Sequence, residues 1–349
     1  ALIQPRVGVN LSASRENLFT KIFAGSGGVD SYTNAISDTY QDNFDEGIFT
    51  GKGIYDVDVY NEILNNEFPE NTILSHDLLE GNFLRCGLLT DVMLLDGYPM
   101  RYIPYILRNH RWIRGDWQIL KWLKNKKLNL LSKFKIFDNL RRSLLPIFCF
   151  LLILLGSINV FNKFTNNVIL IVSLIAILIP YLIDIVNYII FKESNITGAV
   201  YAYKKFSKEL NSIRISVIRI VLQILFLPYE TIQNIDSIVK SLYRMKHKTK
   251  LLEWVTAEDA DKNSKTDLTS YYKEMNFNVI IGILFLIIPG LISKIFGIAW
   301  IIGPILAWYI SLDIQKEYEI SENDNRYLTD IAKRTWNFFE RYVNEDNNY

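Results

Sequence analysis

Four long stretches with almost no charge constrain this chain more than any other feature of its sequence. They are Ser143–Phe161, Val168–Phe191, Met275–Ser293 and Ile295–Leu312, and the only charged residue in them is Asp184. A bilayer core of about 30 Å needs roughly 20 apolar helical residues, and helices of soluble proteins seldom run that long without a polar face. The sequence therefore predicts four transmembrane helices, over residues 143–161, 168–191, 275–293 and 295–312.

The distribution of Lys and Arg predicts the orientation of these helices. Basic residues are dense in residues 121–142 and in the loop 192–274, whereas the two short connections carry one lysine each, Lys163 and Lys294. Because basic loops stay on the cytoplasmic side, we expect the N-terminal region, the middle loop and the C-terminal tail to be cytoplasmic. The chain is then a multi-pass protein of the cytoplasmic (inner) membrane, with the lipid bilayer as a partner.

A fifth apolar stretch, Ile213–Pro228, is interrupted by Arg214 and Arg219. Its uncharged run is only about half the length that a transmembrane helix needs. We interpret it as an amphipathic helix that lies at the cytoplasmic interface.

Composition excludes several classes of protein. The chain has 38 Lys and Arg against 37 Asp and Glu, a net charge of +1, which argues against a nucleic-acid-binding protein. Half of its residues are hydrophobic, too many for a disordered chain. Two cysteines, Cys86 and Cys149, cannot form a disulfide framework. His76, His110 and His247 belong to no metal-binding motif.

Residues 1–120 alternate between strand-like and helix-like segments, which indicates an α/β layer. We expect strands at 2–10, 47–55 and 90–95, the last of them buried, and helices at 32–39, 57–65, 77–86 and 102–123. Ser75 is available as the N-cap of the helix that begins at Asp77. The glycines of Gly25–Gly28 lack the Lys-Ser/Thr of a phosphate-binding loop, and a flexible loop is the better interpretation.

Three segments occur in an order that resembles the cyclic β-1,2-glucan synthase family, glycosyltransferase family 84. They are Phe49–Leu64 (FTGKGIYDVDVYNEIL), Ile73–Pro99 (ILSHDLLEGNFLRCGLLTDVMLLDGYP) and Arg108–Leu123 (RNHRWIRGDWQILKWL). Leu251–Asp259 and Arg334–Tyr349 resemble later parts of the same proteins. Those synthases are far longer, so the resemblance implies an internal fragment. Residues 1–123 would be the C-terminal half of a transferase domain, 124–320 a membrane region, and 321–349 a tail that begins the next helical domain.

The resemblance implies a GT-A fold like that of processive family-2 transferases such as cellulose synthase, with UDP-glucose as donor and a β-glucan as acceptor. Ser75-His76-Asp77 occupies the place of the Thr-Glu-Asp motif, so Asp77 matches the catalytic residue, although His76 departs from Glu. Arg111 and Trp112 match the Arg-Trp pair of the Gln-x-x-Arg-Trp motif, in which Arg108 replaces Gln. Mg²⁺ or Mn²⁺ is implied too, with its Asp-x-Asp ligands expected upstream of this chain.

Sugar transfer needs a base that takes the proton of the acceptor hydroxyl, and Asp77 is the candidate. A helix-terminal charge is its alternative role. His76 either tunes the site or hydrogen-bonds locally. Arg111 can neutralise a leaving diphosphate and Trp112 can stack on a glucose ring.

His110 belongs to the same helix as Arg111 and Trp112, and an interfacial position of this Trp- and Arg-rich helix is the alternative. Asp116 is interpreted as structural, in a pair with Arg114 or another basic residue. Trp254 and Trp336, like Trp122, are interpreted as packing or interface residues.

Asp56-x-Asp58 has the spelling of a metal-binding motif, but its position in the motif order favours acceptor contact or helix capping. Asp58 is therefore kept as a candidate for acceptor binding.

Together these features predict a membrane glucosyltransferase that builds β-1,2-linked glucan from UDP-glucose, here as a fragment expected to be inactive alone. The alternative is a non-catalytic membrane scaffold or polysaccharide-export segment. The sequence leaves the oligomeric state open.

Overall fold

The computed structural model describes residues 1–10, 13–24, 39–158, 160–193, 212–255, 259, 261, 262, 264–313, 321–343 and 345. Ala1–Leu312 forms one compact unit and Asp313–Tyr349 a second. The loop expected at Gly25–Gly28 and nearly all of the helix expected at 32–39 lie outside the described residues.

A small mixed sheet lies at the N-terminal end of the first unit. Its strand order is β2 (Ile54–Tyr55), β1 (Leu2–Val9) and β3 (Cys86–Asp96), with β1 antiparallel to β2 and parallel to β3. This confirms an α/β layer in coarse form. The expectation that residues 90–95 are buried is wrong, because Leu95 is 59% exposed and its apolar neighbours in β3 are exposed as well.

Short helices lie between the strands: η1 (Ala13–Arg15), α1 (Leu18–Phe23) and α2 (Thr39–Phe44) before β2, and α3 (Val57–Leu64) and α4 (Asp77–Leu84) before β3. The longer α5 (Tyr102–Gln118) and then η2 (Leu120–Lys124) follow β3. The helices expected at 57–65, 77–86 and 102–123 are thus present, whereas η1 and α1 were not expected. Of the strand expected at 47–55, only β2 forms. The side chain of Gln4 explains the difference: it donates to the carbonyl of Ile48 (3.1 Å) and accepts from the amide of Thr50 (2.5 Å), in place of a neighbouring strand.

The apolar stretches form helices whose bounds differ from the expected spans. The helices are α6 (Leu130–Ser157), α7 (Lys163–Glu193), α12 (Asn276–Ile287) and α13 (Leu291–Ile310), and the short helix α11 (Leu268–Glu274) comes just before α12. Within the described residues, three helices are long and apolar enough to cross a membrane: α6, α13 and the helix over 215–247. The count of four is therefore not confirmed.

The turn between α12 and α13 falls at Ile288–Gly290 instead of the expected Ser293–Lys294. Pro289 has no amide hydrogen with which to continue the helix, and Gly290 has φ +129°, which favours glycine. α12 is consequently only 12 residues long, about 18 Å at 1.5 Å per residue. The two helices cross closely, because a β-carbon on Gly282 would lie 2.8 Å from the carbonyl oxygen of Gly297.

The stretch 213–228 does not end at its proline but is part of α9 (Ser212–His247). A proline inside a helix leaves the carbonyl four residues earlier without its partner. Here that carbonyl, Ile224 O, accepts a hydrogen bond from the indole Nε1 of Trp300 at 2.9 Å. A side chain from α13 thus replaces the missing bond, and the helix continues.

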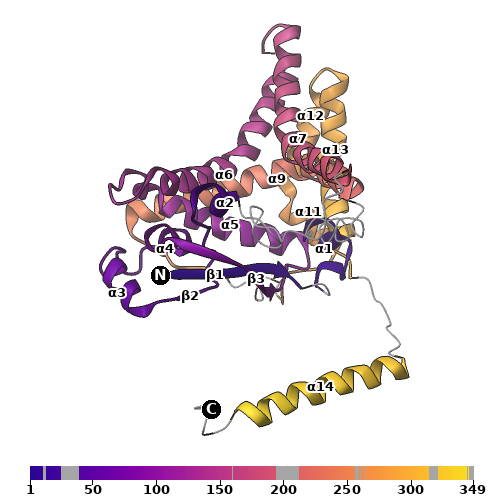
Figure 1. Ribbon diagram of the computed structural model, residues 1–349. Coiled ribbons are helices and arrows are strands. Elements are labelled where there is room, and N and C mark those ends of the chain that lie inside the picture. The colour runs from indigo at the N-terminus through magenta and orange to yellow at the C-terminus, as the bar shows by residue number, and fades with distance from the viewer. Residues whose placement is uncertain are drawn as a thin grey trace. The chain divides into compact units, whose positions relative to one another are not determined.

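α9 lies between the sheet-bearing part and the hairpins formed by α6 with α7 and by α12 with α13 (Figure 1). Near its N-terminal end, Arg219 donates to the carbonyl of Ile22 in α1. Near its C-terminal end, Ser241 Oγ donates to the carbonyl of Arg114 in α5 at 3.0 Å. Both ends of α9 therefore contact the helices that pack beside the sheet.

A buried ion pair joins α6 to the segment before β2. Lys135 Nζ lies 2.8 Å from Glu46 Oε1 and donates to the carbonyl of Gly47 at 3.0 Å, with both charged side chains almost fully buried. Arg85 adds a second cation on Glu46 (3.0 Å). In the second unit, α14 (Glu322–Tyr342) begins at the N-cap Ser321 and is exposed along its length.

Candidate active site

Asp77 is the first residue of α4, and its side chain is half-buried. The N-cap position is His76, with no side-chain capping bond, so the expected Ser75 cap is wrong. Ser75 Oγ instead donates to Asp77 Oδ2 (3.4 Å). The hydroxyl thus helps to hold the carboxylate, and the carboxylate remains directed away from the helix.

A cavity of about 660 Å³ opens in front of Asp77, a size typical of ligand sites. The three segments of the family resemblance meet here: Phe49 and Thr50 from the first, Asp77 from the second and Trp112 from the third all line it. Gly115 lets α5 approach Ser75, because a β-carbon on Gly115 would lie 2.9 Å from that of Ser75. The fold therefore brings Asp77 and Trp112 to one cavity.

The electrostatics of Asp77 suit a proton acceptor. Burial raises the pKa of Asp77 above its ordinary value, and the negative charge of Glu80 adds to the increase. His76, the hydroxyl of Ser75 and the guanidinium of Arg111 act in the opposite direction. A carboxylate with a raised pKa is a stronger base than one in water.

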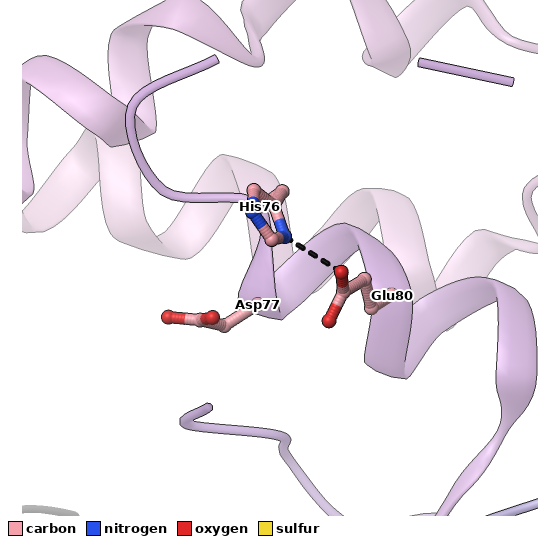
Figure 2. A group of neighbouring side chains, drawn as sticks. All are labelled: His76, Asp77 and Glu80. Carbon is pink, nitrogen blue, oxygen red and sulfur yellow. Dashed lines mark ion pairs between the residues drawn. The ribbon is translucent and has the colours of Figure 1, made fainter. Parts of the chain in front are cut away.

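His76 and Glu80 form an ion pair one helical turn apart, with 2.6 Å between His76 Nδ1 and Glu80 Oε1 (Figure 2). The same Glu80 oxygen accepts a hydrogen bond from the hydroxyl of Tyr60 at 2.8 Å. The hydrogen bond to Glu80 raises the pKa of His76. Burial tends to raise the pKa of Glu80, but the bonds from His76 and Tyr60 give a net decrease.

Arg111 lies close enough to Asp77 to influence its charge, but it does not line the cavity. Its guanidinium lies over the ring of Trp254, 4.8 Å from the centroid. The segment that carries Trp254 is fastened to α5 by two further bonds: Arg114 donates to the carbonyl of Glu253 (2.8 Å) and Gln118 to that of Leu251 (3.0 Å). The later segment of the resemblance thus packs beside the predicted site.

The structure places the other two candidates away from the cavity. His110 Nε2 lies 2.8 Å from Asp236 Oδ2 on α9, and burial lowers the pKa of His110. Asp58 is exposed in the first turn of α3, whose N-cap is Asp56: Oδ1 of Asp56 accepts from the amides of residues 58 and 59 at 3.1 Å. The capping interpretation of this motif is thus the one that the geometry favours.

Asp116 lines the cavity. Of the two expected partners, Arg114 or another basic residue, the second is the one that acts on it, through the charge of Arg142. Oδ1 of Asp116 accepts a hydrogen bond from Asn139 of α6 at 2.9 Å. Burial raises its pKa to about 6, against the hydrogen bond from Asn139 and the charge of Arg142.

Sequence reasoning missed the polar side chains that α6 and α9 contribute to this cavity. They are Lys135, Asp138, Asn139, Arg142 and Ser143 from α6, and Arg219, Gln223, Glu230 and Asn234 from α9. Asn234 also donates to the carbonyl of Ser143 at 2.9 Å, which links the two helices. The available signals were a polar stretch at 133–143 and single polar residues within the more apolar sequence of α9, and neither reveals which helices face each other.

The residues present do not fit Mg²⁺, which prefers an all-oxygen octahedral site. Within the part of the chain that the structure describes, one group of potential ligands converges, His76, Asp77 and Glu80, with donor atoms within 4.8 Å of one another. One donor is an imidazole, and that imidazole is already paired with Glu80. No step of the chemistry is therefore assigned to a metal on these residues.

Three described helices that could cross a membrane and the similarity to one known glucan synthase support a membrane protein related to glucan synthases. The curated cyclic β-(1,2)-glucan synthase NdvB of Rhizobium meliloti (strain 1021) is 33% identical to this chain over 363 aligned residues. The alignment covers 100% of this chain and 13% of NdvB. The expected resemblance is thus confirmed over the whole chain, which spans about an eighth of the relative's length. The chain matches no family model.

Proposed function

We propose that this chain carries the acceptor-activating part of a glucosyltransferase that transfers glucose from UDP-glucose to a growing β-1,2-glucan at the cytoplasmic face of the inner membrane. The observation that carries the proposal is the position of Asp77: a half-buried carboxylate with a raised pKa, facing a cavity together with Trp112. The name of the relative, a cyclic β-(1,2)-glucan synthase, supports the choice of sugar and linkage.

In the proposed reaction, Asp77 takes the proton from the acceptor hydroxyl as that oxygen attacks the anomeric carbon of the donor glucose. The bond from the anomeric carbon to the diphosphate oxygen breaks, and UDP leaves. Arg111, held over Trp254, contributes positive charge toward the departing diphosphate. Trp112 offers a flat face to a glucose ring, and Arg108 lies over its indole at 4.6 Å.

The polar wall from α6 and α9 suits a neutral sugar chain. Asn139 and Asn234 bring amides to the cavity, and amides can exchange hydrogen bonds with sugar hydroxyls. We propose that acceptor glucan contacts this wall. A donor-binding Asp-x-Asp motif with Mg²⁺ or Mn²⁺ is proposed to come from residues outside this chain.

Asp77→Asn in the full-length protein tests this function. The amide keeps the size of the side chain but cannot accept the proton, so glucan synthesis should fall by about 10²-fold or more. The affinity for UDP-glucose should change little. The measurement is the initial rate of glucose incorporation against UDP-glucose concentration in membranes, with expression checked for each variant.

Asp56→Asn and Asp58→Asn are the matched controls, since both acids lie outside the cavity lining. They should leave the rate within about threefold, because surface substitutions usually change stability by no more than about 0.5 kcal/mol. Near-normal turnover in Asp77→Asn would remove Asp77 as the base. A selective rise in the Mg²⁺ concentration that Asp58→Asn requires would instead place the metal site at residues 56–58.

A further inference from the structure

Tyr60, Glu80 and His76 form a hydrogen-bonded group beside Asp77 that does not line the cavity. Tyr60 and His76 both bond to Oε1 of Glu80, at 2.8 and 2.6 Å, and Glu80 is only 7% exposed. Two donors on one buried oxygen fix the carboxylate, and the carboxylate in turn fixes the imidazole. Figure 2 shows the Asp77 carboxylate directed away from this pair.

We propose that His76 is a positioning residue for Asp77: held by Glu80, which Tyr60 also bonds, its imidazolium stabilises the ionised carboxylate that accepts the proton. This inference rests on the proposed function. His76 does not act as the base itself, because Asp77 lines the cavity and His76 does not. A donor nitrogen of His76 nevertheless lies within 4.8 Å of an Asp77 oxygen, close enough for their charges to interact.

Groups of both charges act on the ionisation of Asp77. Burial and Glu80 disfavour its ionised form, whereas His76, Ser75 and Arg111 favour it. Arg111 approaches from α5 and is itself partly buried, while His76 and Glu80 belong to the start of α4.

Glu80 raises the pKa of both residues, which disfavours the charged form of Asp77 and favours the charged form of His76. It acts on Asp77 directly through its charge and on His76 mainly through the hydrogen bond between them. The imidazole therefore keeps its positive charge to higher pH than a free histidine would, and this charge offsets the direct effect of Glu80 on Asp77.

The test is the pH dependence of kcat/KM for UDP-glucose in the full-length protein with His76→Gln and His76→Lys. Glutamine can still donate to Glu80 but carries no charge, so the pKa of Asp77 should rise. The acidic limb of the profile should then move to higher pH by roughly 0.5 to 1 unit, a modest shift because His76 is half-exposed. His76→Lys restores the positive charge and should return the limb to its original position.

His247→Gln is the matched control, because His247 lies at the end of α9 outside the cavity lining, and its profile should be unchanged. A rate loss in His76→Gln that is equal at every pH, or a limb that does not move, would overturn the role of His76. Failure of both His76 variants to fold would also overturn this role. If the wild-type protein transfers no glucose from UDP-glucose, the proposed function itself is wrong, and the role of His76 is rejected with it.

Discussion

Gly51 and Asp77 are in direct contact: a β-carbon placed on Gly51 would lie 2.9 Å from Oδ1 of the carboxylate. Gly51 also has φ +85°, in the left-handed region that favours glycine. The FTGKG segment therefore fits against the candidate base only because this position has no side chain.

Gly51→Ala should reduce glucose transfer by the full-length protein at least about tenfold, because the methyl group displaces Asp77 and small displacements of reacting groups are costly. The backbone strain should add about 1–2 kcal/mol of destabilisation. Initial rates and the melting temperature in detergent measure the two effects. Gly97→Ala is the control, since a β-carbon there meets nothing within 4 Å. Equal behaviour of the two variants would contradict the importance of the Gly51–Asp77 contact.

Trp254→Ala should raise the KM for UDP-glucose by roughly 3- to 30-fold, the equivalent of a cation–π interaction of about 0.6–2 kcal/mol. The reason is that Arg111 loses the ring over which it lies. Trp254→Phe should have a smaller effect, because phenylalanine keeps an aromatic face. Trp336→Ala serves as the control, since the indole of Trp336 bonds to Glu340 within α14. An unchanged KM in Trp254→Ala would show that Trp254 does not support donor binding.

Asp116→Asn should stabilise the protein at neutral pH. The pKa of Asp116 is raised to about 6 in the folded state by burial, above the ordinary value near 4. The folded state therefore binds more protons than the unfolded state between these values, and stability falls as pH rises through that window. The melting temperature of Asp116→Asn should match wild type near pH 4 and exceed it above pH 6, by an amount equivalent to at most about 3 kcal/mol. A difference that is constant from pH 4 to pH 8 would rule out this cause.

Labelling of single-cysteine variants at Lys262, Asn66 and Lys163 should show whether α9 lies along the membrane surface or crosses the membrane. Because both ends of α9 contact helices that pack beside the sheet, we expect it to lie along the membrane surface even though its length and composition would allow it to cross. Lys262 and Asn66 should then be labelled from the cytoplasmic side and Lys163 from the opposite side. The background should lack the two native cysteines, Cys86 and Cys149, both buried. Labelling of Lys262 from the same side as Lys163 would show that α9 crosses.

Local features of the sequence were enough to predict most of the helices. The apolar periodicity gave helices at 57–65, 77–86 and 102–123 to within a few residues, because helix formation depends on neighbours along the chain. The spacing of His76 and Glu80 also places them on one helical face, so their pairing was available from the sequence. The motif order marked Asp77, Arg111 and Trp112 as candidates.

Tertiary structure decided what these residues contact. Asp77 and Trp112 reach one cavity, whereas His110 turns to Asp236 and Asp58 stays at the surface, and the motifs do not distinguish these outcomes. α9 continues past Pro228 because an indole from α13 satisfies the free carbonyl of Ile224. Periodicity and charge act between near neighbours, but these contacts join residues far apart in the chain. Only the packing of whole helices determines which of them meet.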